Sequence, residues 1–250
     1  MYYLDLLLAM TEKEIKARYK HAVFGFLWMV LNPVLQMLVI GLIFQYVTKI
    51  TIDNYFLFLF AGLLPWNFFT QTVTKTTPIM VYERSLLQKA KFPREVIVLS
   101  VMLANSFHLL VSLVLLLPVV GIVTGLQIEK VLLLPAALFW IMALTSGLSL
   151  LLTSLNIRFR DVNFFVQALL PLWFYATPIL YKASFLPKTI QPLFYLNPMT
   201  GIIEFFHFSL LGQSVTHMEA IGFSVFVSLV IVVLGVGVFK KHSPYFVDYV

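Results

Sequence analysis

The sequence contains no cysteine and few charged residues, and each shortage narrows what the chain can be. Without cysteine there are no disulfide bonds, no thiolate catalysis and no cysteine-ligated metal site. Only 11% of the 250 residues are charged, against roughly 25% in an ordinary soluble domain. Apolar residues make up 60% of the chain, and its mean hydropathy is +0.94. This composition indicates that lipid surrounds most of the protein.

Several catalytic signatures are also missing. No glycine-rich run ends in Gly-Lys-Ser or Gly-Lys-Thr, so the chain has no P-loop with which to hydrolyse ATP. The five histidines show no HExxH-type spacing, and no Ser/His/Asp constellation can be nominated. We therefore expect no catalytic residue, no metal site and no cofactor bound by this chain. A membrane-embedded enzyme is kept as an alternative.

Ionisable residues are scarce inside the apolar runs. Ion-coupled carriers usually keep such groups within their spans, because these groups carry the coupling ion. Here the main exception is His108, which we interpret as a polar contact to Asn105 or to a neighbouring helix. A secondary transporter is thus disfavoured, and the energy for any transport is expected to come from a partner.

Six apolar segments are long enough to span a membrane, whose hydrocarbon core of about 30 Å needs about 20 helical residues. The segments are 22–48, 55–74, 96–124, 131–156, 162–181 and 218–239. No linker or internal repeat divides the chain. We predict an all-α membrane protein with six transmembrane helices, formed as a single domain over residues 1–250.

The basic residues gather in short segments between these runs. With the N-terminus inside, the inner segments 1–21, 75–95, 157–161 and 240–250 hold 13 of the 17 lysines and arginines. This asymmetry predicts that both termini are cytoplasmic. The net charge of +6 is then a marker of topology, and we expect no nucleic-acid partner.

Residues 1–21 are predicted to form an amphipathic helix at the membrane interface. Apolar and charged side chains fall on different faces: Leu4, Leu7, Leu8, Ile15 and Tyr19 on one, and Glu12, Lys13, Lys16 and Lys20 on another. The alternative is an extension of the first span. It is disfavoured because basic residues are costly in hydrocarbon.

The segment 82–95 (YERSLLQKAKFPRE) is too short to span and too charged to embed. It predicts a short cytoplasmic helix that is stopped by Pro93. The alternative is a solvated loop whose basic residues only hold the topology.

Prolines are concentrated where the chain is expected to emerge on the outer side. Five of the twelve lie between residues 171 and 198. Because proline interrupts helices, we expect short re-entrant helices over 183–212 that form an outer gate. An ordinary surface loop is the alternative.

Aromatic residues make up 16% of the chain and cluster within and beside the spans. Their faces can stack on the C–H faces of sugar rings, and tyrosine and tryptophan add a polar tip. Ordinary aromatic belts at the membrane interface are the alternative for any one cluster. Gly121 and Gly125 form a GxxxG pattern, which indicates close helix packing only weakly.

Six runs of the sequence resemble one transporter family. The run KARYKHAVFGFLWMVLNPVLQ (16–36) resembles the RY-x-x-S-x-LG-x-x-W-x-x-x-x-P signature that opens the permease subunits of polysaccharide exporters in the type-2 ABC family. Ala22 stands in a stretch where this family often has a serine, a departure that concerns local packing. The further matches are AGLLPWNFF (61–69), LLQKAKFPRE (86–95), NIRFRDV (156–162), WFYATPILY (173–181) and YLNPMTGIIEFF (195–206).

The resemblance is strongest to O-antigen exporters, and capsule and teichoic-acid permeases share the pattern. It implies a homodimer in the bacterial inner membrane, paired with two ATPase subunits that bind the ATP and magnesium. The implied cargo is a glycan attached to undecaprenyl diphosphate. A permease for another lipid or drug amphipath and an assembly scaffold are kept as alternatives, because a fold does not fix cargo.

The resemblance also implies roles for particular residues. A coupling helix that docks in the ATPase is implied for Glu83, Arg84, Ser85, Leu86, Leu87, Gln88, Lys89 and Lys91. Near the interface helix, either the lipid diphosphate or ordinary membrane lipid is implied for Lys16, Arg18 and Lys20. Bracing of the second inner loop is implied for Arg158, Arg160 and Asp161. The lining of a glycan channel between two protomers is expected for Tyr55, Trp66, Phe69, Trp173 and Tyr175.

Overall fold

The computed structural model describes residues 2–20, 27–47, 52–89, 92–125, 127–215 and 218–249. All regular structure within these ranges is helical, which confirms the predicted all-α class. In chain order the elements are α1 (Tyr2–Tyr19), α2 (Trp28–Val47), α3 (Tyr55–Thr76), α4 (Ile79–Tyr82), α5 (Arg84–Lys89), α6 (Glu95–Thr124), α7 (Ile128–Val131), α8 (Leu134–Arg158), α9 (Asp161–Tyr175), η2 (Ala183–Phe185), α10 (Gln191–Tyr195), α11 (Pro198–Leu211), α12 (Met218–His242), η3 (Ser243–Tyr245) and α13 (Phe246–Tyr249).

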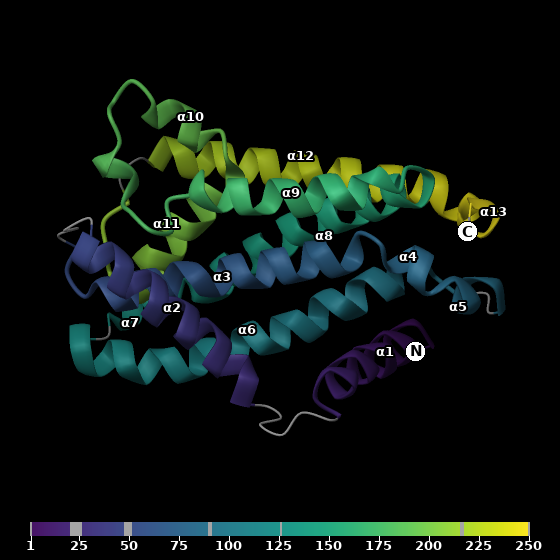
Figure 1. Cartoon of the computed structure of the whole chain (residues 1–250), viewed down its shortest axis with the longest axis horizontal. Coiled ribbons are helices and arrows are strands. Elements are labelled where there is room, and N and C mark those ends of the chain that lie inside the picture. Colours follow the sequence, from purple (N-terminus) through teal and green to yellow (C-terminus); the bar gives the residue numbers. More distant parts are fainter. Residues whose placement is uncertain are drawn as a thin grey trace.

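The long helices α3, α6, α8, α9 and α12 run roughly along the long axis of the molecule, and α2 is inclined to it (Figure 1). Four stretches are long and apolar enough to cross a membrane, namely Tyr55–Thr76, Glu95–Thr124, Ile128–Arg158 and Ile221–Tyr245. A shorter apolar stretch, Val30–Tyr46, lies in α2. The chain is therefore a membrane protein with several apolar helices.

Helix α9 is shorter than the apolar run that predicted it. The run continues to residue 181, but the helix has 15 residues and ends at Tyr175. Pro178 explains the early end, because a proline disfavours the helical conformation of the residue before it, here Thr177. The short elements η2 and α10 and the longer α11 follow, where short outer helices were expected.

Helix α3 lies at the centre of the bundle, in contact with α2, α6, α8, α9 and α11. The most apolar part of α3 is 72% buried within the chain, whereas that of α12 is only 17% buried. Large aromatic and aliphatic side chains such as Phe58, Leu63 and Phe69 fill the contacts around α3. The exposed apolar surface of α12 is suited to lipid rather than water.

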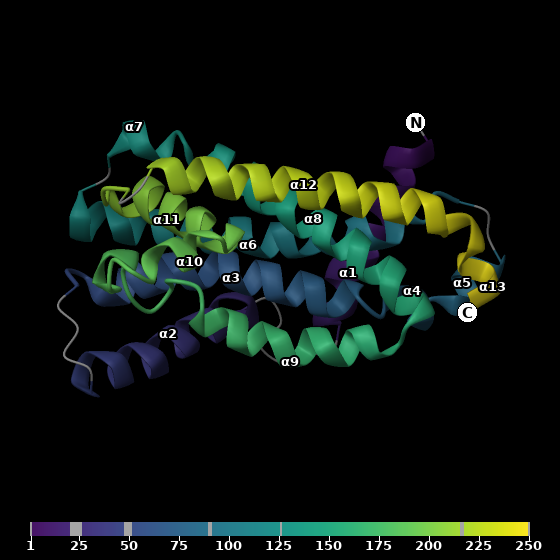
Figure 2. The ribbon, with the colours of Figure 1, turned by 90° about the horizontal axis from the view of Figure 1, so that it is seen from above.

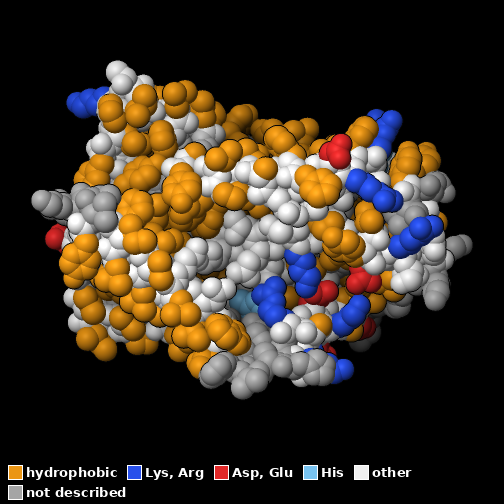
Figure 3. Space-filling view, viewed as in Figure 1, with side chains coloured by type: hydrophobic (Ala, Val, Ile, Leu, Met, Phe, Trp, Pro, Cys, Tyr) orange, Lys and Arg blue, Asp and Glu red, His pale blue; other side chains and the backbone are white. Residues whose placement is uncertain are grey.

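The two ends of the bundle differ in character. Helices α4, α5 and α13 gather at one end together with the start of α1, while α7, α10 and α11 lie at the other (Figures 1 and 2). Figure 3 shows that acidic and basic side chains concentrate on the α1 and α5 end of the face in view, and that hydrophobic side chains cover most of the rest. The first and last helices thus share the charged end.

A second buried cluster joins the short helices at the charged end to the bundle. It contains Leu87 of α5, Phe239 of α12 and Phe246 of α13, with Met80 and Ile97 beside them. The rings of Phe239 and Phe246 meet edge to face, with centroids 5.2 Å apart. Helix α5 is therefore packed onto the body of the protein rather than loose in solvent.

Two glycines allow α8 and α12 to cross closely. A methyl group on Gly147 would lie 2.6 Å from the Cα atom of Val232, and one on Gly235 would strike the carbonyl oxygen of Gly147. By contrast, Gly125 of the GxxxG pattern ends α6 with a positive φ of 75° and has no atom within 4 Å of such a methyl group. The close packing thus lies elsewhere than the pattern indicated.

We predict that Gly235→Ala destabilises the protein, because the added methyl group forces the two backbones apart. The loss should be about 1–3 kcal/mol, as for other overpacked sites. The matched control is Gly237→Ala, which has open space around it and should be neutral or stabilising by up to about 1 kcal/mol. The measurement is the fraction of folded protein left after heating in detergent. If both variants lose half of their folded protein at the same temperature, a steric contact at Gly235 is ruled out.

Candidate functional site

Helix α1 lies across the long helices rather than along them (Figures 1 and 2). It contacts α6, and its side toward the bundle is of mixed character. The partly buried residues on that side include Tyr3, Leu6, Leu7, Met10, Thr11, Glu14, Ile15 and Arg18. Leu4 and Leu8, expected on the apolar face, are more than 60% exposed. The bundle therefore receives polar as well as apolar side chains from α1.

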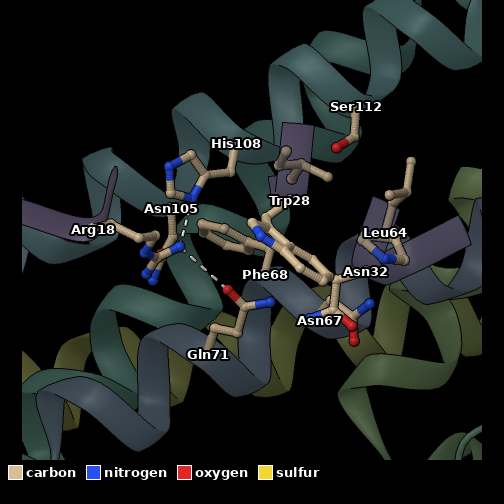
Figure 4. A pocket seen from close by; sticks show the side chains of 12 residues that line it. Arg18, Trp28, Asn32, Leu64, Asn67, Phe68, Gln71, Asn105, His108 and Ser112 are labelled. Atoms are coloured by element: carbon tan, nitrogen blue, oxygen red, sulfur yellow. Dashed lines mark hydrogen bonds between the residues drawn. The ribbon is translucent and has the colours of Figure 1, made fainter. Parts of the chain in front are cut away.

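Arg18 reaches from α1 to polar side chains of α3 and α6 (Figure 4). Its Nη2 donates to Oδ1 of Asn105 at 2.8 Å, and its Nη1 lies 2.6 Å from Nδ1 of His108 and 3.4 Å from Oε1 of Gln71. A guanidinium can only donate, so Nδ1 of His108 accepts and the ring proton lies on Nε2. Asn105 also donates to Oγ1 of Thr72 at 2.9 Å. One arginine thus ties three helices together.

Two ion pairs add to the attachment of α1. Glu14 pairs with Lys75 of α3 next to the Arg18 contacts. Lys13 lies 3.7 Å from Glu83, the residue between α4 and α5. Because the Lys13 and Glu83 side chains are 60% and 30% exposed, this pair contributes little to stability. It does, however, connect α1 directly to the segment around α5.

The three basic residues that were singled out on α1 have different environments. Lys16 is exposed and lies 2.5 Å from Glu12, whose pKa is lowered by the hydrogen bond and the charge of Lys16. Lys20 is exposed at the end of the helix. Only Arg18 is directed into the protein, so the residues of this group are not brought together into one cluster.

A cavity of about 480 Å³, here called the Arg18 cavity, opens beside Arg18 between α1, α2, α3 and α6. Its polar lining comprises Asn32, Asn67, Gln71, Asn105, His108 and Ser112, and its apolar lining includes Trp28, Leu64 and Phe68 (Figure 4). Amide and hydroxyl groups are uncommon in spanning helices and mark functional sites there. The lining offers one positive charge and several neutral donors and acceptors, which suits a ligand with anionic and hydroxyl oxygens.

Sequence reasoning missed the amides of this cavity. The residues are scattered over three apolar runs, so no local motif contains them. The available signal was single amides such as Asn32, Asn67 and Asn105 within otherwise apolar stretches. His108 was expected to contact Asn105 or a neighbouring helix, and its contact to Arg18 of α1 confirms the second alternative.

The segment implied as a coupling helix, Glu83 to Lys91, contains the short helix α5. Helix α4 ends at Tyr82 and α5 begins at Arg84, with Glu83 between them. Leu87 is buried and Leu86 partly buried against the second cluster, while Arg84, Ser85 and Gln88 are exposed. The side chain of Lys89 and the whole of Lys91 lie outside the described residues. Helix α5 thus presents a polar outer surface on an apolar foundation.

Three of the five aromatic residues expected in the channel lie together, and the other two lie apart from them. Trp66, Phe69 and Trp173 contact one another, with ring centroids 5.2–6.5 Å apart. Tyr55 is buried and donates from its hydroxyl group to the carbonyl oxygen of Leu180, and Tyr175 is 64% exposed. The five residues therefore do not form one continuous wall.

A shallow groove between α3 and α9 is bordered by two aromatic residues, of which Trp66 is only 4% exposed and Phe174 is partly exposed. It is lined by Trp66, Thr70 and Thr74 of α3 and by Gln167, Leu170, Pro171 and Phe174 of α9. The rings of Trp66 and Phe174 lie 5.6 Å apart. Phe174, which was not among the expected lining residues, contributes directly to this groove. Such a surface of aromatic and hydroxyl groups can contact sugar rings without enclosing them.

The turn between α8 and α9 is held by an amide. The backbone N–H of Asn163 donates to Oδ1 of Asn156 at 3.1 Å. Arg158, Arg160 and Asp161 are exposed, and neither arginine forms a salt bridge with Asp161 among the described residues. The Arg158 guanidinium instead lies 5.3 Å from the ring centroid of Phe159.

The sequence pattern of the ABC-2 type transporter family matches residues 5–211, and so covers most of this bundle. The chain belongs to this family. The resemblance to ABC-2 exporter permeases is thereby confirmed. The chain is a transporter component in which the Arg18 cavity and α5 lie on the same membrane-embedded domain.

Several ABC-2 proteins are similar over most of their length. An O-antigen export system permease protein RfbA of Klebsiella pneumoniae is 31% identical over 249 residues, which are 99% of this chain and 95% of that protein. The RfbA protein of Myxococcus xanthus is 38% identical over 208 residues, covering 80% and 78% of the two chains. The polysialic acid transport protein KpsM of Escherichia coli is 20% identical over 240 residues, covering 94% and 92%.

We predict that Arg18→Ala loosens α1 of this ABC-2 transporter from the bundle, because Asn105 and His108 lose their charged donor. A hydrogen bond to a charged group contributes about 1.5–3 kcal/mol. Amide hydrogen exchange in α1 should therefore accelerate about tenfold or more. Lys20→Ala removes the same charge from an exposed position of the same segment and is the control. Unchanged exchange in the Arg18 variant, or equal acceleration in both, would contradict the prediction.

Proposed function

We propose that this chain is the permease subunit of an ATP-driven exporter that moves undecaprenyl-diphosphate-linked O antigen outward across the bacterial inner membrane. The observation that carries this proposal is the Arg18 cavity, a cationic and amide-rich site inside the apolar bundle of an ABC-2 transporter. A cargo with a charged diphosphate and hydroxylated sugars matches that lining. The full-length similarity to O-antigen permeases at 31–32% identity favours O antigen over polysialic acid, whose transport protein is 20% identical.

The proposed topology has six membrane crossings with both termini in the cytoplasm. The crossings are α2, α3, α6, α8, α9 and α12, of which all but the inclined α2 run roughly along the long axis (Figure 1). In this arrangement the charged end with α5 and α13 faces the cytoplasm, as the excess of basic residues there favours. Helices α10 and α11 belong to the outer end, where we propose that they act as a re-entrant cap.

Energy is proposed to come from two separate ATPase subunits, which bind the ATP and magnesium that this chain has no P-loop to hold. The outer surface of α5, with Arg84, Ser85 and Gln88, is the proposed contact with the ATPase. Because Leu87 is buried in the second cluster, a displacement of α5 is passed to the bundle rather than absorbed by a loop.

A second route for the same displacement runs through α1. Glu83 precedes α5 and pairs with Lys13, and Arg18 lies on the same helix as Lys13. In the proposed mechanism, movement of α5 shifts α1 and changes the contacts of Arg18 with His108 and Asn105. The Arg18 cavity would then hold the diphosphate in one state of the ATPase and release it in the other.

The glycan is proposed to pass between two copies of the chain. Figure 2 shows α2 and α9 on one side of α3 and α12 on the other. The side with α2 and α9 carries exposed apolar residues and the aromatic groove of Trp66 and Phe174. With this side facing the partner copy, the two grooves would line a shared channel. Contacts of this open kind are weak, which suits a polymer that must slide.

The coupling role of α5 is tested with the permease and its ATPase expressed together. Arg84→Glu reverses an exposed charge on the proposed contact. It should abolish co-purification, because an ATPase surface that is complementary to Arg84 would repel a glutamate there. Lys188→Glu makes the same change in an exposed residue far along the chain from α5 and is the control. ATP turnover by the co-purified complex, and retention of lipid-linked glycan inside cells lacking the permease, complete the test. A wild-type permease that neither binds the ATPase nor affects glycan location would overturn the proposal.

The dimer is tested by cysteine cross-linking. Because the sequence has no cysteine, each introduced thiol is the only site in the chain that can react. Phe165→Cys and Leu172→Cys place single thiols on exposed positions of α9, 64% and 68% exposed respectively. We expect both to give cross-linked dimers with a bifunctional thiol reagent. Val233→Cys on α12, 70% exposed, is the control and should stay monomeric. Efficient cross-linking through α12 with none through α9 would place the dimer interface on the α12 side and contradict the proposed channel.

A further inference from the structure

A second cavity lies at the outer end of the bundle. It has a volume of about 280 Å³ and is formed by α3, by residues 178–184 after α9, by α11 and by residues 213–214. Small-molecule sites typically measure about 300–1,000 Å³, so this outer cavity is of the size for one ring rather than an oligosaccharide. None of its residues belongs to the Arg18 cavity or to the aromatic groove.

Glu204 supplies the outer cavity with a carboxylate that is poorly paired. Its Oε1 lies 3.5 Å from the hydroxyl group of Tyr195, at the limit of a hydrogen bond. Its Oε2 is buried and has no hydrogen-bond partner within the described part of the chain. A buried carboxylate oxygen without a donor is costly, so Glu204 is an underpaired carboxylate in the lining of this cavity.

The remaining lining offers donors and an apolar wall. Lys182, Ser184 and Gln213 contribute an ammonium, a hydroxyl and an amide group. Lys182 and Glu204 form no salt bridge with each other among the described residues, so the two charges are not already paired across the cavity. Phe58 forms part of the wall, and its ring stacks on His207 with centroids 4.0 Å apart.

His207 is fixed as part of this wall rather than as a titrating ligand. Its Nε2 donates to the carbonyl oxygen of Phe58 at 3.0 Å. A methyl group on Gly62 would lie 3.2 Å from that nitrogen, so the glycine gives the ring its space. Phe58 and His207 are only 1% and 4% exposed, so the stacked pair is a rigid backing of the wall, and the partly buried Tyr181 is the aromatic residue of the lining that retains exposed surface.

The mixture of groups decides the class of ligand. An anion is opposed by Glu204, and a cation is opposed by Lys182. A neutral molecule with several hydroxyl groups can donate to the carboxylate, accept from the ammonium and amide, and lay an apolar face on an aromatic ring. A single uncharged sugar residue has these properties.

The position of the outer cavity matches the proposed direction of export. Phe58 precedes Trp66 of the aromatic groove by eight residues of the same helix, which is about 12 Å at 1.5 Å per residue. Residues 178–184 likewise follow Phe174 just after the end of α9. A sugar chain leaving the groove toward the outer end would meet this cavity next.

We propose that the outer cavity binds one neutral sugar residue of the exported glycan, with Glu204 accepting from sugar hydroxyls and Lys182 donating to them. This inference rests on the proposed export function. It adds a specific, one-residue contact at the exit to the non-specific aromatic contacts along the groove.

The test measures binding of delipidated glycan, released from the lipid-linked polymer of the host, to the permease and ATPase complex in lipid nanodiscs. Glu204→Gln keeps the side-chain shape and removes the charge, and Lys182→Gln replaces the ammonium with a shorter neutral amide. Each should raise the dissociation constant about tenfold, equivalent to about 1.4 kcal/mol. Glu129→Gln and Lys188→Gln change exposed residues outside the cavity and should bind as the wild type does. ATP turnover should be equal in all five proteins, which shows that they are folded.

The proposal is overturned if the wild type does not bind the delipidated glycan, if the Glu204 and Lys182 variants bind it unchanged, or if the control variants weaken binding equally. Failure of the export function itself has a separate signature. In that case the wild-type permease neither co-purifies with the ATPase nor changes where lipid-linked glycan accumulates, whatever the outcome of the binding measurement.

Discussion

An arginine inside an apolar bundle needs acceptors around it, and Arg18 organises its surroundings to meet that need. Its donors are taken up by Asn105 and Gln71 and by the ring nitrogen of His108. These partners come from α3 and α6, so α1 is tied to two helices of the bundle at one point. Oδ1 of Asn105 would lose its charged donor without the arginine, and the arginine would lose its acceptors without these partners. The attachment of α1 therefore depends on the whole network.

The three hollows of the molecule share helix α3 and differ in chemistry. The Arg18 cavity combines a positive charge with amides. The groove between α3 and α9 is bordered by aromatic residues, and the outer cavity contains both a carboxylate and an ammonium group. This order parallels the parts of a lipid-linked glycan, from the charged head group to the uncharged sugars. A rigid, largely buried α3 keeps the three surfaces in a constant relation to one another while surrounding helices move.

The sequence predicted the long helices well where charges bound the apolar runs. Helix α6 begins at Glu95 and ends at Thr124, next to the expected limits, because a charged residue and Gly125 mark its ends. Helix α9 ended early because a single proline outweighed a continuing apolar run. The site was less predictable. Arg18 was identified, but its partners at positions 71, 105 and 108 are distant in sequence, and no local pattern reports such contacts.

The aromatic residues show the same division. Their abundance was evident from composition, but which rings are accessible depends on how α3 and α9 cross. Phe69 is fully buried, and Phe174, a neighbour of the expected Trp173, borders the groove instead. The short helix α13 has a further consequence. Leu87 beneath α5 shares its buried cluster with Phe246 of α13. A change that removes the Phe246 ring would therefore loosen α5, although the two residues are far apart in the sequence.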